Sequence, residues 1–148
     1  MSVQTIKSLL QPDGNASPQK IGFLLLNDFS MLAFASAIEP LRAANRQSNS
    51  HLYDWVIASP SGMPAVASNG VEVAADGDAA VLQDCRMVFV CAGLNVRENT
   101  DRNILNLVRR LDRNGAVIGA ICTGTYVMAA AGLLEERRCT IHWENIDG

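Results

Sequence analysis

Short, continuous runs of apolar residues recur along this chain and limit what it can fold into. Residues 21–26, 87–91 and 116–121 are almost wholly apolar and do not alternate with polar residues. Strands buried on both faces of a parallel sheet have this pattern, whereas strands with one wet face alternate. Residues 53–58 and 139–141 are predicted as two further strands. The pattern therefore indicates a sheet that is covered on both sides.

Helical patterns separate these strands. Ser30 is the predicted N-cap of a helix that ends near Asn45 and contains Pro40, which is expected to kink it. Residues 100–113 carry apolar side chains at helical spacing, and residues 123–131 form a shorter helix closed by a glycine. Strands that alternate with helices predict βαβ units. We therefore expect an α/β fold with a mostly parallel sheet between two helix layers.

The chain divides into two unequal parts. Residues 1–19 are polar and contain several Pro and Gly breakers, so they are predicted to form a flexible N-terminal arm. Residues 20–148 carry the alternating pattern and are predicted to form one domain. Within it, residues 64–66 and 71–73 are expected to form a small hairpin outside the main sheet.

Composition excludes several functions. The 148-residue chain has a net charge of −3, whereas nucleic-acid-binding surfaces are usually basic. No apolar run approaches the roughly 18 residues that span a bilayer, and no secretory signal is evident, so a cytoplasmic location is expected. The four cysteines are not in CxxC spacing, which predicts free thiols and no metal site or other cofactor. They are Cys85, Cys91, Cys122 and Cys139.

Cys122 lies where a strand is predicted to meet a helix. Gly119 and Gly124 flank it, which is the arrangement of a nucleophile elbow, where a tight turn exposes the reactive side chain. The start of the following helix would favour a thiolate, and its N–H groups could bind a carboxylate. The alternative is a small buried residue at a strand–helix junction.

Other polar residues are predicted at the same edge of the sheet, where ligands of α/β proteins collect. Residues 27–29 and 92–95 follow two of the buried strands. His142 follows the last predicted strand and is expected on the same rim, whereas His51 is expected to be a solvated loop residue. Trp143 is expected either to hold an apolar or cationic group or simply to pack.

Four separated motifs together resemble one family. They are FSMLAFASAIEPLRAAN at 29–45, ASNG at 67–70, GAICTG at 119–124 and TIHWE at 140–144. The chain from about Lys20 onward resembles the ThiJ/PfpI (class I glutamine amidotransferase-like) domain at the N-terminus of GlxA-type AraC-family transcriptional regulators. The resemblance implies a flavodoxin-like sandwich that binds a small metabolite, helps to form a homodimer, and contacts DNA only through a C-terminal helix-turn-helix domain absent here. It also implies that this domain is C-terminally incomplete.

The resemblance carries over to individual positions. Cys122 matches the family's elbow cysteine, and Gly93 matches the position whose backbone N–H faces it. Enzymes of the superfamily place an acid from the first helix beside the cysteine, where this chain has Ala33. Their cysteine is often followed by histidine, where this chain has Thr123. Without an acid or adjacent imidazole, a thiol lacks the usual means of orientation and proton transfer.

We therefore expect a ligand-sensing domain that is not an enzyme and binds a small nitrogenous zwitterion, such as an amino acid or a quaternary amine. One alternative is a cysteine-dependent hydrolase, hydratase or glyoxalase-like enzyme that uses Cys122 with His142. Another is a dimeric scaffold with an empty pocket. The predicted ligand-binding residues are Asn27, Phe29, Ala33, Gly93, Leu94, Asn95, Cys122, Thr123, His142 and Trp143.

Overall fold

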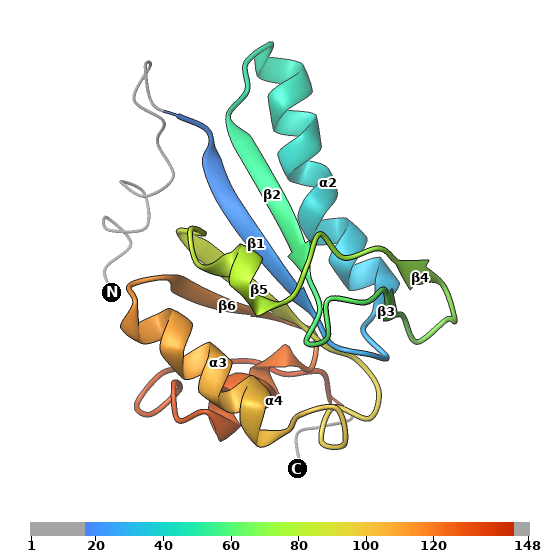
Figure 1. The fold of residues 1–148 in the computed structure, drawn as a ribbon, viewed down its shortest axis with the longest axis vertical. Helices are drawn as coiled ribbons and strands as arrows, with labels where there is room; N and C mark the ends of the chain where they lie inside the picture. Colours follow the sequence, from blue (N-terminus) through green and yellow to red (C-terminus); the bar gives the residue numbers. More distant parts are fainter. Residues whose placement is uncertain (1–16, 144–148) are drawn as a thin grey trace.

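A four-stranded parallel sheet forms the centre of the computed structural model, which describes residues 17–143 (Figure 1). The strand order is β2-β1-β5-β6, and every neighbouring pair is parallel. The sheet confirms the predicted α/β fold. The strands are β1 (Gln19–Leu25), β2 (Tyr53–Ala58), β5 (Met87–Cys91) and β6 (Val117–Ile121).

Helices cover both faces of this sheet (Figure 1). One face packs against α2 (Met31–Ser48), and the other against α3 (Arg102–Arg113), α4 (Gly124–Ala130) and the short 3-10 helix η1 (Ala79–Leu82). On the α2 face, the ring of Phe23 lies 5.5 Å from that of Phe34, edge to face. Burial of apolar side chains on both faces is what the unbroken apolar runs of the strands require.

The predicted N-cap of α2 is confirmed, but the helix is longer than expected. The Ser30 hydroxyl accepts a hydrogen bond from the backbone N–H of Ala33 at 3.3 Å. The helix continues through Pro40 and ends at Asn49, whose φ of 50° places it in the left-handed region. Asparagine tolerates that conformation, and the polar residues before it contain no stronger helix breaker.

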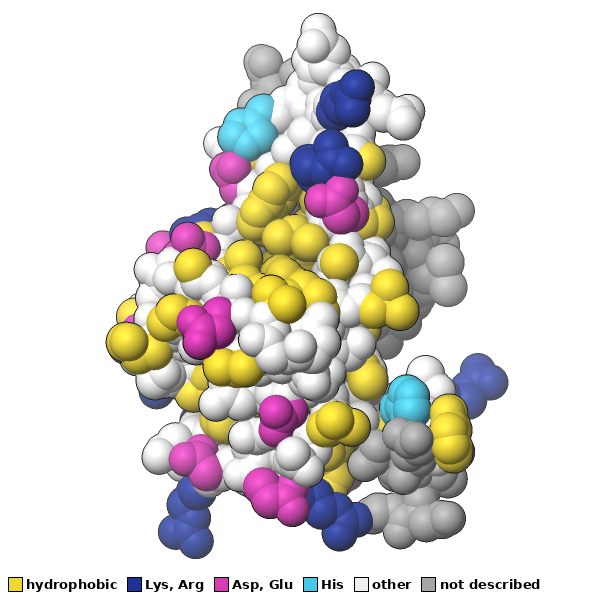
Figure 2. Space-filling view, turned by 90° about the vertical axis from the view of Figure 1, so that its right-hand side faces the viewer, with side chains coloured by type: hydrophobic (Ala, Val, Ile, Leu, Met, Phe, Trp, Pro, Cys, Tyr) yellow, Lys and Arg dark blue, Asp and Glu magenta, His cyan; other side chains and the backbone are white. Residues whose placement is uncertain are grey.

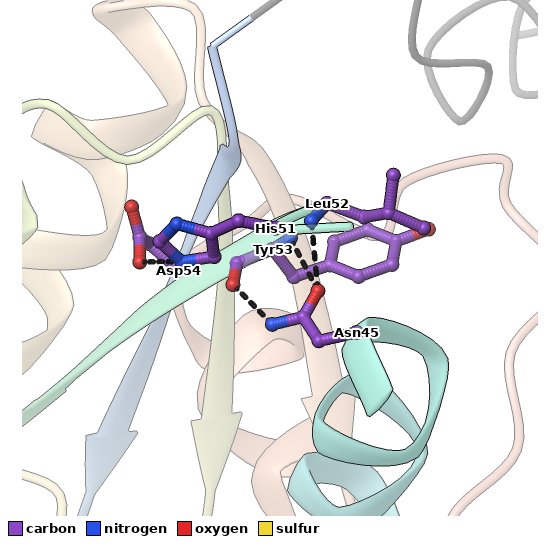
Figure 3. A network of polar contacts seen from close by, with 5 residues as sticks. All are labelled: Asn45, His51, Leu52, Tyr53 and Asp54. Carbon is purple, nitrogen blue, oxygen red and sulfur yellow. Dashed lines mark hydrogen bonds and ion pairs between the residues drawn. The ribbon is translucent and has the colours of Figure 1, made fainter. Parts of the chain in front are cut away.

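A polar network joins the end of α2 to the start of β2 (Figure 3). The Asn45 side chain donates to the Tyr53 carbonyl at 2.8 Å and accepts from the N–H groups of Leu52 and Tyr53 at 2.8 and 3.0 Å. Nearby, the exposed His51 pairs with Asp54 at 2.7 Å. His51 therefore lies at the surface, as predicted, and takes part in local structure.

The predicted hairpin forms outside the main sheet and consists of β3 (Ala65–Val66) and β4 (Glu72–Val73). Backbone hydrogen bonds attach it to the end of β1, since Asp28 N donates to Val66 O at 2.8 Å and Ser68 N to Phe29 O at 2.9 Å. Figure 2 shows the side that carries α2 and this hairpin, where hydrophobic side chains form a band between charged ones. The hairpin turn is thus held over the carboxyl end of the sheet.

One prediction about the ends of the domain is wrong. Residues 139–141 form no strand; a hydrogen bond of 2.8 Å from the Thr125 hydroxyl to the Thr140 carbonyl ties this segment to α4 instead. The first strand begins at Gln19, inside the predicted N-terminal arm, and residues 1–16 of that arm lie outside the described residues. Within residues 17–143, no helix is long and apolar enough to cross a membrane.

Candidate functional site

Cys122 occupies a tight turn between β6 and α4. Its φ of 57° is in the left-handed region, which is uncommon for a residue with a side chain. The flanking glycines are required by close packing: a Cβ on Gly119 would lie 2.6 Å from the Phe89 ring, and one on Gly124 would lie 2.2 Å from the Val90 carbonyl oxygen. The elbow geometry indicated by the sequence is therefore present.

The elbow is tied to the loop that follows β5. The Thr123 hydroxyl donates a hydrogen bond to the Gly93 carbonyl at 2.7 Å, and so it does not cap α4. Gly93 also packs closely against the loop after β1, since a Cβ there would lie 2.1 Å from the Asp28 carbonyl oxygen. Three segments far apart in sequence thus meet at the carboxyl end of the sheet.

Asp28 holds the loops after β1 and β5 together. Its carboxylate accepts hydrogen bonds from the side-chain amides of Asn95 and Asn99, at 3.0 and 3.1 Å. Asn99 also donates to the Asn27 carbonyl at 3.0 Å. Both Asp28 and Asn95 have positive φ values, of 62° and 51°. Sequence reasoning located both loops but missed Asn99, because nothing in the local pattern shows which side chain it meets.

A cavity of about 410 Å³ lies over these three loops. It contains six of the predicted ligand-binding residues, together with two serines that the prediction missed. Ser30 was recognised only as a helix cap, and Ser68 reaches the cavity because the hairpin bonds to Phe29. The lining residues are Ser30, Ser68, Gly93, Leu94, Asn95, Cys122, Thr123 and His142.

Four predicted residues do not line this cavity. Phe29 is 0% exposed and packs edge to face against Phe34 at 5.8 Å, so it belongs to the core. Asn27 uses its side-chain oxygen to accept from the N–H of Val66 at 3.2 Å. Trp143 is 72% exposed and lies beside His142, with ring centroids 5.7 Å apart. Ala33 lines a neighbouring cavity.

The four cysteines differ in environment. Cys122 is half-buried, and its sulfur makes no hydrogen bond within residues 17–143, with His142 or with any other group. Burial raises the pKa of the Cys91 thiol far above its ordinary value, and burial also raises the pKa of Cys85. Cys139 is exposed. In the described part of the chain, no group of His, Cys, Asp and Glu is arranged to hold a metal ion.

His142 lines the same cavity as Cys122, although it does so from an irregular segment and not from the end of a strand. The two side chains are brought to one site without forming a thiol–imidazole hydrogen bond.

Comparison with known proteins places this geometry in a family. The sequence model of the DJ-1/PfpI family matches residues 19–147. The HTH-type transcriptional regulator CdhR of Pseudomonas aeruginosa is 46% identical over 129 residues, which are 87% of this chain and 38% of the relative. The HTH-type transcriptional regulator GlxA of Rhizobium meliloti is 43% identical over 128 residues, covering 86% of this chain and 40% of that protein. The chain thus spans less than half the length of these relatives.

A solved structure has a similar fold. The crystal structure of an AraC family transcriptional regulator from Pseudomonas putida superimposes with a TM-score of 0.77 at 27% identity, covering 88% of this chain and 70% of that one. The residues that the family model matches include the sheet, the Cys122 elbow and the loops that surround it. This chain therefore belongs to the DJ-1/PfpI family.

Proposed function

We propose that this chain is the ligand-sensing domain of a transcriptional regulator. Relatives that match almost the whole chain are named HTH-type transcriptional regulators and extend well beyond the matched region. In this proposal residues 20–148 are the sensor domain, residues 1–19 are an N-terminal arm, and DNA is contacted by a helix-turn-helix domain elsewhere in the polypeptide. The sensor domain also forms a homodimer, which light scattering after size-exclusion chromatography tests directly.

Among residues 17–143, the lack of an acidic group beside Cys122 is the observation that carries the proposal. No carboxylate of residues 17–143 lines the cavity around Cys122, and Ala33 stands where the resemblance places the acid of the enzymes. The Cys122 sulfur also lacks a hydrogen-bonding base in the described part of the chain. A pocket of this kind can bind a molecule but has no evident means to activate a thiol.

The predicted ligand is a small nitrogenous zwitterion, such as an amino acid or a quaternary amine. Apart from the apolar Leu94, the lining side chains are hydroxyls, an amide, a thiol and one imidazole, and none of them carries a permanent charge. Such a surface favours a ligand without net charge, because an isolated ion would lose its hydration without gaining a partner. Hydroxyl and amide groups can still hydrogen-bond to both ends of a zwitterion.

Isothermal titration against a panel of amino acids and quaternary amines tests this function. We expect one class to bind and to raise the melting temperature of the chain, because a ligand at 100 times its Kd stabilises the native state by about 2.7 kcal/mol. Binding should weaken in a Cys122→Leu variant, which fills the cavity. If no zwitterion binds or stabilises the chain, the sensor proposal is contradicted and the scaffold with an empty pocket is favoured.

A second candidate function is a cysteine-dependent hydrolase, hydratase or glyoxalase-like enzyme. The left-handed conformation of Cys122, and the presence of His142 in the same cavity, favour it. The decisive experiment measures turnover of amide, isocyanide and dicarbonyl substrates by the wild type and by Cys122→Ser. Turnover that disappears in the variant would establish the enzyme, whereas an unchanged background rate with altered ligand affinity supports the sensor.

A further inference from the structure

A second cavity adjoins the first on the other side of Cys122. It has a volume of about 580 Å³ and shares Ser30, Cys122 and His142 with its neighbour. Its remaining walls come from the start of α2, the end of β6, the start of α4 and the segment that leads to His142. Because the two cavities share three lining residues, they lie next to each other at the Cys122 elbow.

The two cavities differ in chemical character. The first is bordered by Ser68, Asn95 and Thr123, whereas the second has mostly small or apolar walls. Leu32, which lines the second cavity, is 79% exposed. The additional residues of the second cavity are Leu32, Ala33, Ser36, Ala120, Thr125 and Ile141, together with Thr140.

We infer that the two cavities form one bipartite site, in which the second cavity accepts the alkyl portion of a zwitterionic ligand and Ala33 limits its length. This inference rests on the proposed ligand-sensing function and extends it to the shape of the ligand. The charged ends of the ligand lie in the polar cavity with Ser68 and Asn95. An unbranched alkyl group passes Cys122 and lies against Ala33.

Ala33 is a suitable residue to set this length. Its backbone N–H is held by the Ser30 hydroxyl at 3.3 Å, in the first turn of α2, so its position relative to the elbow is fixed. Its side chain is half-buried in the wall of the cavity. Leucine has a helix propensity close to that of alanine, so Ala33→Leu should fill the cavity while keeping α2 intact.

The test measures chain-length selectivity. Isothermal titration is performed with glycine, alanine, 2-aminobutyrate, norvaline and norleucine on the wild type and on Ala33→Leu. Each methylene buried in the second cavity should tighten binding to the wild type about fourfold. In Ala33→Leu the affinity should no longer rise with each added methylene.

Two further variants make the outcome decisive. Ser36→Leu narrows the same wall from one turn later on the exposed side of α2, and it should also flatten the gradient. Ala129→Leu makes the same kind of addition at an exposed position of α4 outside both cavities, and it should keep the wild-type gradient.

The possible results separate the two levels of the argument. If the wild type binds none of the series, the amino-acid form of the proposed function fails, and the bipartite site fails with it. If the wild type binds without a gradient, or Ala33→Leu retains the gradient, the ligand does not enter the second cavity and only the bipartite site is refuted. Circular dichroism confirms that each variant is folded.

Discussion

Replacing Asn45 with alanine should destabilise the chain although Asn45 is far from the cavities. The Asn45 side chain makes three hydrogen bonds to the backbone of Leu52 and Tyr53, and these bonds connect the last turn of α2 to the first residues of β2 (Figure 3). Alanine would leave the two N–H groups and one carbonyl without these partners. The loop between α2 and β2 would then lose its main side-chain attachment.

The magnitude follows from those three bonds. A net contribution of about 0.5–1.5 kcal/mol for each gives a total of about 1.5–4.5 kcal/mol. The bonds are only partly buried, so water can replace some of them, and a loss of about 2–3 kcal/mol is expected. For a chain of this size, that corresponds to a fall in melting temperature of about 6–9 °C. The exposed His51–Asp54 pair nearby contributes little by comparison.

Thermal and urea unfolding monitored by circular dichroism measure the effect. The matched control is Gln47→Ala, because Gln47 is an exposed amide on the same helix and makes no hydrogen bond through its side chain in the described part of the chain. The control should unfold within about 2 °C of the wild type, as surface substitutions usually do. If the melting temperature of Asn45→Ala falls no further than that of Gln47→Ala, the three hydrogen bonds do not contribute the expected stability.

Four other results are expected. Gly93→Ala should abolish ligand binding and lower stability, because the added Cβ would lie 2.1 Å from the Asp28 carbonyl oxygen. Titration measures the binding, and thermal unfolding measures the stability. Asp28→Ala should lower the free energy of unfolding by about 2 kcal/mol, because two hydrogen bonds are lost and alanine tolerates the positive φ less well. Urea unfolding measures this loss, and Asp28→Asn should retain most of the stability. Thiol-reactive probes, followed by mass spectrometry, should label Cys139 first and Cys122 next, and should not label Cys91 in the folded chain. Burial raises the pKa of Cys91, so its thiol stays protonated in the native state. The same thiol ionises in the unfolded chain above about pH 8.5, and the free energy of unfolding measured in urea should therefore fall as the pH rises further. Cys91→Ala should reduce this pH dependence.

Most of the fold could be predicted because its strands are buried on both faces. An unbroken apolar run such as residues 87–91 indicates a buried strand without information from the rest of the chain, and β5 has the predicted bounds. Residues 139–141 were misassigned because three residues with strand propensity do not reveal whether a partner strand lies beside them. The Thr125–Thr140 hydrogen bond, which holds this segment against α4, depends on tertiary contacts that no local pattern encodes.

The candidate site was predictable where it depends on strand ends and not where it depends on single side-chain directions. Gly93 and Cys122 follow neighbouring strands, and the general rule for α/β sheets places them together. Phe29 was expected beside them, but Asp28 before it adopts a left-handed conformation, and Phe29 packs into the core. Ser68 was missed because its approach depends on the hairpin's bond to the Phe29 carbonyl.

The conformation of Cys122 links this geometry to the proposed function. A residue other than glycine in the left-handed region costs about 1–2 kcal/mol, and the turn also requires glycine at positions 119 and 124. Packing alone does not explain why a cysteine occupies this left-handed conformation, since glycine at position 122 would fit the same backbone without strain. The strained turn instead places a small, polarisable thiol where the two cavities meet. In the proposed sensor, this position would contact the ligand. Cys122→Gly should therefore preserve or raise stability while weakening ligand binding. Equal ligand affinity in the wild type and in Cys122→Gly would show that the sulfur does not contact the ligand.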